Sequence, residues 1–177
     1  MLQFRILQEQ DLPLLHDWLN RQHIKQTFSG PLGMTYENVR QKYIPRILGE
    51  DPARPYLICA DEVPIGYIQT YLWRDYPAYS SELQLEQVTA GLDLFIGEEA
   101  YLGRGLGAEL IRSFALQVIF ADREVESCVI TPLISNRRAL RAYSKAGFRQ
   151  LATMHHPEEP EQIAVMKLDR HDLLAPM

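Results

Sequence analysis

The chain has 177 residues, 46% of them hydrophobic and 23% charged, which is ordinary for a globular protein of one domain. We therefore expect a single domain over residues 1–177. The net charge of −5 argues against a nucleic-acid partner, and no apolar run approaches the length of a membrane span. The amino-terminal residues lack the pattern of a secretory signal, so we expect a cytoplasmic protein without a membrane partner.

The first half of the chain predicts a strand, two helices and a β-hairpin. Alternating apolar residues indicate the strands, apolar residues at helical spacing indicate the helices, and Asp11 and Thr35 are candidate N-caps. Pro45 is expected to kink or shorten the second helix, and Gly66 indicates a bulge or a close approach by a neighbouring segment. The expected segments are a strand at 2–7, a helix at 12–20, a loop at 22–34, a helix at 35–48 and paired strands at 55–60 and 63–73.

The second half predicts an irregular insertion followed by alternating strands and helices. The insertion, 74–89, shows no clear period and contains Glu82 and Glu86, and Gly147 is the expected left-handed stop of a helix. The expected segments are a strand at 91–96, a turn at 97–104, a helix from 105, a strand at 126–131, a helix at 136–146, paired strands at 148–155 and 162–168, and a frayed tail. Together the two halves predict an α/β fold, a mixed central sheet with helices on both faces.

Three alternating glycines, Gly103, Gly105 and Gly107, stand where the turn gives way to a helix. Glycine lets the backbone turn tightly, and the unpaired N–H groups and positive dipole of a helix start attract anions. The segment therefore indicates a phosphate site. It lacks the Gly-Lys-Ser/Thr ending of a mononucleotide loop and the spacing of a dinucleotide loop. The alternative is a flexible glycine turn without a ligand.

The histidines and cysteines do not indicate a metal site. His155 and His156 are adjacent in a predicted strand, so their side chains point to opposite faces. Cys59 and Cys128 lie in apolar runs, where cysteine behaves as a small buried hydrophobe. A serine hydrolase is not supported either, because the chain has no Gly-x-Ser-x-Gly elbow.

The chain contains LGRGLG at 102–107 and SNRRALRAYSKAGF at 135–148. In this order the two segments resemble the cofactor motifs of the GNAT superfamily of N-acetyltransferases. The resemblance implies the GNAT acyl-CoA N-acyltransferase fold, with acetyl-CoA (coenzyme A) as cofactor and the strand at 91–96 beside its pantetheine arm. Leu102 departs from the polar residue usual in the family. The residues implied to bind the cofactor are Leu94, Phe95, Ile96, Leu102, Gly103, Arg104, Gly105, Leu106, Gly107, Asn136, Ala139 and Tyr143.

Acetyl transfer needs an amine that has lost a proton and a group that protonates the leaving thiolate. Asp93 is the only charge in the run 91–96, and a carboxylate there can hold an ammonium and receive its proton. The alternative is that Asp93 faces solvent at the start of the strand. The resemblance makes Tyr143 the acid, and the alternative for Tyr143 is a core residue. Keeping both residues favours an enzyme over a non-catalytic acyl-CoA-binding module.

The chain as a whole resembles the aminoglycoside 6′-N-acetyltransferases, which confer antibiotic resistance. The resemblance lies in DWLNRQHI at 17–24, YIPRIL at 43–48, EVPIGYIQTY at 62–71 and the two cofactor motifs. It implies a cationic small-molecule amine as acceptor, and the implied substrate residues are Phe28, Tyr43, Gln69, Glu82 and Asp93. Thr131 departs from an acidic residue of that subgroup, so a lysine side chain, a siderophore precursor or a polyamine is the alternative acceptor. We expect a monomer or a homodimer.

Overall fold

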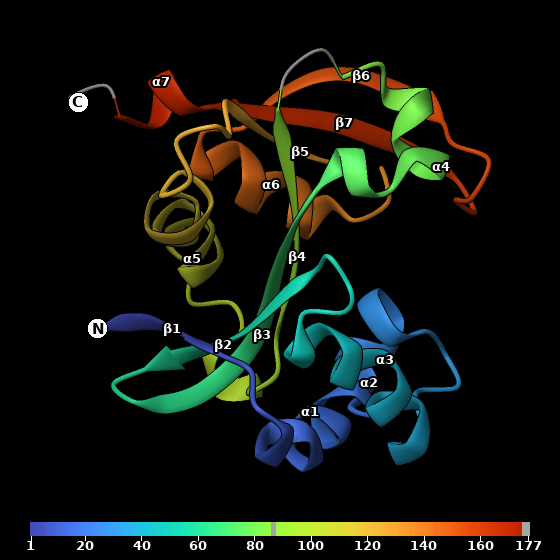
Figure 1. Cartoon of the computed structure of the whole chain (residues 1–177), viewed down its shortest axis with the longest axis vertical. Coiled ribbons are helices and arrows are strands. Elements are labelled where there is room, and N and C mark those ends of the chain that lie inside the picture. The colour runs from blue at the N-terminus through green and yellow to red at the C-terminus, as the bar shows by residue number, and fades with distance from the viewer. Residues whose placement is uncertain (86–87, 175–177) are drawn as a thin grey trace. The chain divides into compact units, whose positions relative to one another are not determined.

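The computed structural model of the chain describes residues 1–85 and 88–174, which hold a seven-stranded sheet in the order β1-β2-β3-β4-β5-β7-β6 (Figure 1). The strands are β1 (Leu2–Ile6), β2 (Arg54–Ala60), β3 (Val63–Leu72), β4 (Thr89–Ile96), β5 (Ser127–Ile130), β6 (Arg149–His155) and β7 (Gln162–Asp169). The described registers are antiparallel for β1–β2, β2–β3, β5–β7 and β6–β7, and parallel for β4–β5. This mixed sheet confirms the predicted fold class.

The longer helices fall between the strands as the sequence predicts, whereas the shorter ones were not predicted. The longer ones are α1 (Leu12–Leu19), α3 (Tyr36–Leu48), α5 (Leu106–Phe114) and α6 (Arg137–Ala146), and the shorter ones are α2 (Gln22–Ile24), α4 (Pro77–Ser80) and α7 (Arg170–Leu174). The chain forms two compact units: unit 1 holds residues 1–70 and 93–104, and unit 2 holds residues 71–92 and those from 105 onward. Within the described ranges, no helix is long and apolar enough to span a bilayer.

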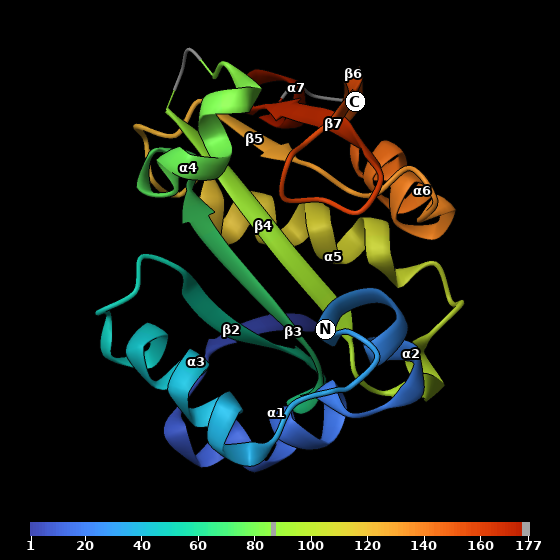
Figure 2. The same ribbon diagram turned by 90° about the vertical axis from the view of Figure 1, so that its right-hand side faces the viewer.

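Unit 1 is built on α1 and α3, which pack against each other and bury an apolar cluster beside β2 (Figure 2). The largest side chains in this cluster are Trp18, Tyr43 and Tyr67, none of which has exposed surface. Burying an aromatic side chain removes a large apolar area from water, so these three residues contribute strongly to the stability of the unit. The cluster therefore fixes the positions from which α3 and β3 present their polar side chains.

The caps of α1 and α3 test two predictions. The Thr35 side chain accepts a hydrogen bond from the Asn38 backbone N–H at 3.2 Å, so Thr35 caps α3 as predicted. Asp11 precedes α1 but does not cap it with its side chain, because its carboxylate is paired with Arg5 at 2.9 Å and accepts the Gln8 backbone N–H. Helix α3 also continues beyond Pro45 to Leu48, so the proline does not shorten it.

The prediction of a loop over 22–34 is wrong for its first part. Residues Gln22–Ile24 form α2, and Lys25–Ser29 form a turn of π-helix that carries Phe28. The Ser29 hydroxyl donates to the Leu19 carbonyl at 2.5 Å, which ties this turn to the end of α1. Ile24 is buried in the cluster of unit 1. Tertiary burial of Ile24 and side-chain hydrogen bonds, rather than local helix propensity, hold this segment in helical form.

Both expectations at Gly66 are confirmed. The register between β2 and β3 shifts next to it, since Ile58 pairs with Gly66 but Cys59 pairs with Pro64. A Cβ atom added at Gly66 would lie 2.4 Å from the Phe95 carbonyl oxygen. Only glycine lets β3 approach the backbone of β4 this closely, and Asp93 lies two residues before Phe95 on that strand.

In unit 2, α5 packs beside α6 (Figure 2). Apolar side chains of the insertion pack against β5 and β7. The prediction of an irregular insertion is wrong up to residue 83, because short helical turns follow β3 from Trp73 onward. Tyr79 packs against a cluster that contains Trp73 and Val129, and the Trp73 indole N–H donates to the Val129 carbonyl at 2.9 Å. Glu86 lies outside the described residues. Gly147 has a φ of 108° and ends α6, which confirms the predicted left-handed stop.

Residues 169–174, which follow the last predicted strand, form regular structure that the sequence did not predict. Strand β7 continues to Asp169, and Arg170–Leu174 form α7. The Arg170 guanidinium donates to the backbone carbonyls of Phe120 and Val125 at 2.8 and 2.9 Å. These charge-assisted hydrogen bonds attach the segment to the chain before β5, and composition alone does not reveal them. Residues 175–177 lie outside the described residues.

Candidate active site

A chain of hydrogen bonds in unit 1 leads to the Asp93 carboxylate. The Gln69 side-chain amide donates to the carboxylate at 2.7 Å. The Gln69 carbonyl oxygen in turn accepts from the Tyr67 hydroxyl at 2.7 Å and from the Arg46 guanidinium at 2.6 Å. Because a guanidinium has donors and no acceptor, Arg46 can bond only to the oxygen of the amide, and this contact turns the NH₂ group toward Asp93. The carboxylate is thus held in one place by a buried side chain.

Asp93 itself is half-buried on β4, so the alternative in which it is a fully solvated strand residue does not describe this structure. The two oxygens of a carboxylate can together accept several hydrogen bonds, so an Asp93 carboxylate that accepts from the Gln69 amide can also accept from a charged donor. An ammonium group is the donor that compensates its charge best. This geometry suits Asp93 to hold a protonated amine.

Aromatic side chains pack around Tyr67, the residue whose hydroxyl donates to Gln69. Phe28 contacts Phe95 with ring centroids 4.8 Å apart, and Tyr43 contacts Tyr67 at 5.4 Å in an edge-to-face arrangement. Burial raises the pKa of Tyr43 and of Tyr67 above the ordinary value for tyrosine, so both hydroxyls stay protonated near neutral pH. The Tyr43 hydroxyl is buried and has no hydrogen-bond partner among the described residues. The structure thus brings Phe28, Tyr43, Gln69 and Asp93 together in one unit.

Sequence reasoning missed two members of this network, Arg46 and Tyr67. Arg46 follows Tyr43 by three residues on α3, and Tyr67 precedes Gln69 by two on β3, so each shares a face with a residue that was predicted. Those spacings were available in the sequence. What was not available is the packing of α3 against the hairpin, which makes the faces meet.

The glycine segment has the backbone that a phosphate site needs. Gly103 and Gly105 are exposed, with φ values of 75° and 79°, and a Cβ atom at either position would meet no other atom within 4 Å. Gly105 is the N-cap of α5, whose first N–H groups follow it. The residues therefore fit the pyrophosphate of coenzyme A, because the backbone is open to an approaching anion and the helix start favours negative charge.

The third glycine has a different surrounding. A Cβ atom at Gly107 would lie 3.3 Å from the Cβ of Ala142, so this glycine lets α5 pack closely on α6. Arg104 is exposed, and its guanidinium lies 5.6 Å from the centre of the Tyr101 ring, while Leu102 and Leu106 are half-buried. Their contacts with the cofactor stay predictions, as do those of Leu94, Phe95 and Ile96.

Glu98 anchors the loop that leads to the glycines. It accepts hydrogen bonds from the Trp18 indole at 2.8 Å and from the Arg21 guanidinium at 3.0 Å, and these bonds lower its pKa. A Cβ atom at Gly97 would lie 2.4 Å from the Trp18 ring, so the loop passes directly over that ring. Helix α1 therefore fixes the start of the loop.

The remaining candidates lie in unit 2. The Asn136 side chain caps α6 by accepting the Ala139 N–H at 3.1 Å, and Ala139 is half-buried. Tyr143 is buried and contacts Phe148 with ring centroids 5.5 Å apart. Because Tyr143 and Asp93 belong to different units, the acid role of Tyr143 stays a prediction. Glu82 is exposed, and no described contact connects it to Asp93.

Thr131 lies in a polar cluster that sequence reasoning did not predict. The Tyr79 hydroxyl is 3.1 Å from the Thr131 hydroxyl and donates to the Glu159 carboxylate at 3.0 Å. His156 is buried and stacks on Tyr79 with ring centroids 3.6 Å apart, while His155 is exposed, as the alternation predicts. A carboxylate from the β6–β7 loop therefore lies close to the position where the family subgroup has its own acidic residue.

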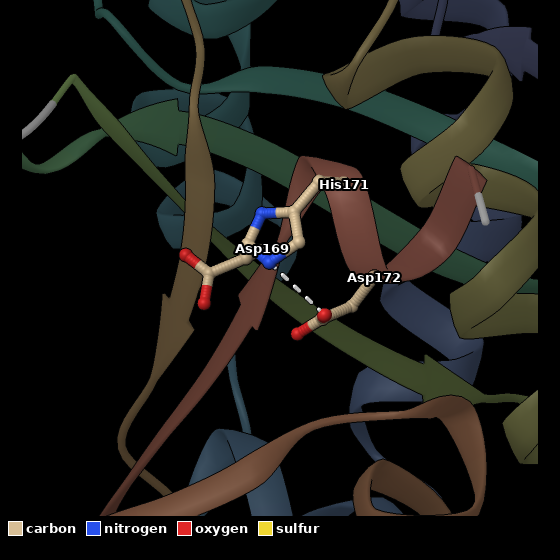
Figure 3. A group of neighbouring side chains, drawn as sticks. All are labelled: Asp169, His171 and Asp172. Carbon is tan, nitrogen blue, oxygen red and sulfur yellow. Dashed lines mark ion pairs between the residues drawn. The ribbon is translucent and has the colours of Figure 1, made fainter.

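One group of potential metal ligands occurs in the described part of the chain, formed by Asp169, His171 and Asp172 (Figure 3). Asp169 is already paired with Lys167 at 2.9 Å and with Arg149 at 2.7 Å. Burial raises the pKa of Asp169, but the hydrogen bond and attraction from Lys167, with the charge of Arg149, outweigh burial and lower it. The group is an ion-pair network whose cations compensate the carboxylates.

The glycine segment can bind the phosphates of an acyl carrier, and Asp93 can hold an amine. An enzyme that transfers an acyl group to an amine needs both. The chain belongs to the GNAT family of acetyltransferases, since residues 8–155 match the acetyltransferase (GNAT) domain. Its cofactor is acetyl-CoA, which supplies the acetyl group as a thioester.

Relatives place the chain near one branch of this family. It is 34% identical to the aminoglycoside N(6′)-acetyltransferase type 1 of Klebsiella pneumoniae over 157 residues, covering 88% of this chain and 78% of the relative. A crystal structure of AAC(6′)-Ib with coenzyme A and kanamycin superposes with a TM-score of 0.86 at 31% identity, over 97% of this chain and 96% of that one. A spermidine N-acetyltransferase from Vibrio cholerae shares the fold alone, with a TM-score of 0.76 at 17% identity over 98% of both chains.

Proposed function

We propose that this protein transfers the acetyl group of acetyl-CoA to a primary amine, and that its acceptor is the 6′-amino group of aminoglycoside antibiotics. The observation that carries the proposal is the half-buried Asp93 carboxylate, held by Gln69 and bordered by aromatic rings. Similarity to aminoglycoside acetyltransferases over most of the chain supports this acceptor over other amines. A cytoplasmic location and a role in drug resistance are part of the same proposal.

Asp93 acts on the amine. Its carboxylate holds the ammonium and favours loss of the proton, directly or through a water molecule, as the nitrogen bonds to the acetyl carbon. A carboxylic acid is far more acidic than an ammonium, so a carboxylate is a weak equilibrium base for it, and the main contribution of Asp93 is orientation of the nitrogen. Gln69 supports this role because its amide fixes the carboxylate in one direction.

Tyr143 acts on the leaving group. As the bond between the acetyl carbon and sulfur breaks, the thiolate needs a proton, and the Tyr143 hydroxyl is the proposed donor. The open backbone of Gly103 and Gly105 supports binding of the pyrophosphate, with Arg104 as an additional positive charge. The other proposed cofactor contacts come from Leu94 to Ile96 on β4 and from Asn136 and Ala139 on α6.

The test is release of free thiol from acetyl-CoA by the purified protein with kanamycin A as acceptor. We expect release together with a product that carries one added acetyl group at the 6′ nitrogen, located by NMR. An otherwise equal drug with a 6′-hydroxyl group is the control and should be a poor acceptor. Release with lysine or a polyamine but not with either kanamycin-type drug would show that the acceptor is wrong while the acetyltransferase activity stands.

A further inference from the structure

Helix α3 presents two cations beside the Asp93 network, at Lys42 and Arg46. The two residues are four positions apart, so they share one helix face. The Lys42 ammonium lies 5.7 Å and the Arg46 guanidinium 5.4 Å from the centre of the Tyr43 ring. Tyr43 is itself one of the proposed acceptor residues, so both cations belong to the surroundings of the acceptor.

Arg46 reaches Asp93 through a single intervening residue. Its guanidinium donates to the Gln69 oxygen at 2.6 Å, and the Gln69 amide donates to Asp93 at 2.7 Å. The Nε atom of Arg46 is buried and lies 3.6 Å from the Asp51 carboxylate. Among the described interactions of this group, two carboxylates, Asp51 and Asp93, therefore face two cations, Lys42 and Arg46.

The pKa of Lys42 supports the view that its ammonium lies near Arg46, Asp51 and Asp93. The pKa of Lys42 is lowered overall by loss of water around its ammonium and by repulsion from Arg46, although the residue keeps exposed surface, and attraction to Asp93 and Asp51 offsets part of the decrease. The Lys42 ammonium thus interacts electrostatically with Arg46, Asp51 and Asp93. An acceptor ammonium bound to Asp93 would experience the same Arg46 charge and that of Lys42 as well.

We propose that Lys42 and Arg46 are specificity-determining residues, which select acceptors that present one ammonium to Asp93 and carry an uncharged hydroxyl or a carboxylate next to it. The inference rests on the proposed role of Asp93 in holding the acceptor amine. A second ammonium close to the first meets two fixed cations, whereas a hydroxyl or carboxylate can accept hydrogen bonds from them. In a partly screened site, one such repulsion corresponds to roughly a three- to tenfold loss of affinity.

Kanamycin A and kanamycin B test this selection because they differ at one carbon of the ring that bears the 6′-amine, a hydroxyl in the first and an amine in the second. Binding of both to the protein loaded with coenzyme A is measured by calorimetry. We expect the parent to bind kanamycin A more tightly, and Lys42→Gln to shift the ratio toward kanamycin B by about three- to tenfold. Lys42→Arg, which keeps the charge, should keep the parent ratio.

Arg40→Gln is the matched control, because it removes one positive charge from the same helix. Arg40 is paired with Glu9 at 2.9 Å and lies two residues before Lys42, which turns it to another side of α3. Its removal should leave the ratio unchanged. An equal shift in Arg40→Gln and Lys42→Gln would overturn the inference, because net charge rather than position would then decide.

A second acceptor pair separates failure of the inference from failure of the proposed function. Cadaverine and 5-amino-1-pentanol differ only in an amine or a hydroxyl at the far end of the same chain. If neither kanamycin releases thiol but Lys42→Gln still shifts binding toward cadaverine, the drug assignment fails and the selection by charge stands. If Lys42→Gln changes neither ratio while its melting temperature matches the parent, Lys42 does not select acceptors and the inference is wrong.

Discussion

At the scale of single residues, the orientation of the Asp93 carboxylate depends on neighbouring side chains that have no proposed contact with the reacting atoms. Tyr67 and Arg46 orient the Gln69 amide, and Gln69 orients the carboxylate. Each donor is buried or half-buried, so water competes little for its hydrogen bond. In the proposed function, a carboxylate held in this way has its orientation before the acceptor binds, which lowers the entropic cost of orienting the amine.

Removing the charge of Asp93 tests its role most directly. Asp93→Asn keeps the shape of the side chain, but an amide neither attracts an ammonium nor receives its proton. We expect kcat/KM for kanamycin A to fall by more than about tenfold, while affinity for acetyl-CoA stays within about twofold of the parent. Steady-state thiol release and calorimetry give the two values. Parent-like kcat/KM in a folded Asp93→Asn protein would mean that Asp93 is not part of the reaction.

Tyr143 is tested by loss of one oxygen atom. Tyr143→Phe keeps the ring that packs on Phe148, so the fold should survive. Loss of a general acid typically lowers the rate of the chemical step by about 10²- to 10⁴-fold, and we expect a decrease in this range in single-turnover experiments. Cofactor affinity should stay nearly constant. A single-turnover rate within about twofold of the parent would return Tyr143 to the role of a core residue.

The sequence pointed to the residues proposed to carry the chemistry, but not to all of the residues that contact them in the structure. Tyr43, Gln69 and Asp93 were found from a family resemblance and from a lone charge in an apolar run. Arg46 could not be found in this way, because a charged residue near the end of a helix is usually solvated. Its half-buried position depends on how α3 packs against β3, and such tertiary contacts do not follow from local patterns.

At the scale of elements, strands and longer helices follow their sequence patterns, and the differences occur where contacts override them. Helix α3 begins at its predicted cap, and the bulge appears beside Gly66. The π-helical turn at Lys25–Ser29 and the final helix α7 were missed, because hydrogen bonds of Ser29 and Arg170 to distant carbonyls hold them. These contacts join segments that are far apart in sequence.

The glycine segment gives a prediction at this scale. Gly105→Val places a β-branched residue at a φ of 79°, which such residues strongly avoid, so the backbone before α5 should rearrange. No neighbouring atom within 4 Å would clash, which confines the change to the segment. We expect affinity for coenzyme A, measured by calorimetry, to fall by at least about tenfold.

Gly49→Val is the matched control for this variant. Gly49 also has a positive φ, 76°, and open space around it, but it ends α3 and is not a proposed cofactor residue. It should lose a similar amount of stability without losing affinity for coenzyme A. Unchanged affinity in folded Gly105→Val protein would show that the backbone of this segment does not hold the cofactor.

At the scale of the whole molecule, each unit carries a carboxylate whose pKa is lowered by cations and hydrogen bonds, Glu98 in unit 1 and Asp169 in unit 2. A carboxyl group whose pKa is lower in the folded chain than in the unfolded chain stabilises the fold. Its full contribution is present when the pH is above its pKa in the unfolded chain. That contribution disappears as the pH falls through the pKa of the group in the folded chain. Unit 1 should therefore lose stability on acidification below a pH of about 4.5, and unit 2 below a pH of about 3.8.

Glu98→Gln isolates this effect, because glutamine can still accept the hydrogen bond of the Trp18 indole but cannot pair with the Arg21 charge. Glu98 and Arg21 are partly exposed, so we expect only about 1 kcal/mol less free energy of unfolding near pH 7. This difference between parent and variant should shrink toward zero as the pH falls below about 4.5, in chemical denaturation followed by Trp fluorescence and circular dichroism. Glu50→Gln, at an exposed position of the same unit, should show no such dependence. A difference that stays constant between pH 7 and pH 3 would mean that the charge of Glu98 contributes nothing to the stability of the fold.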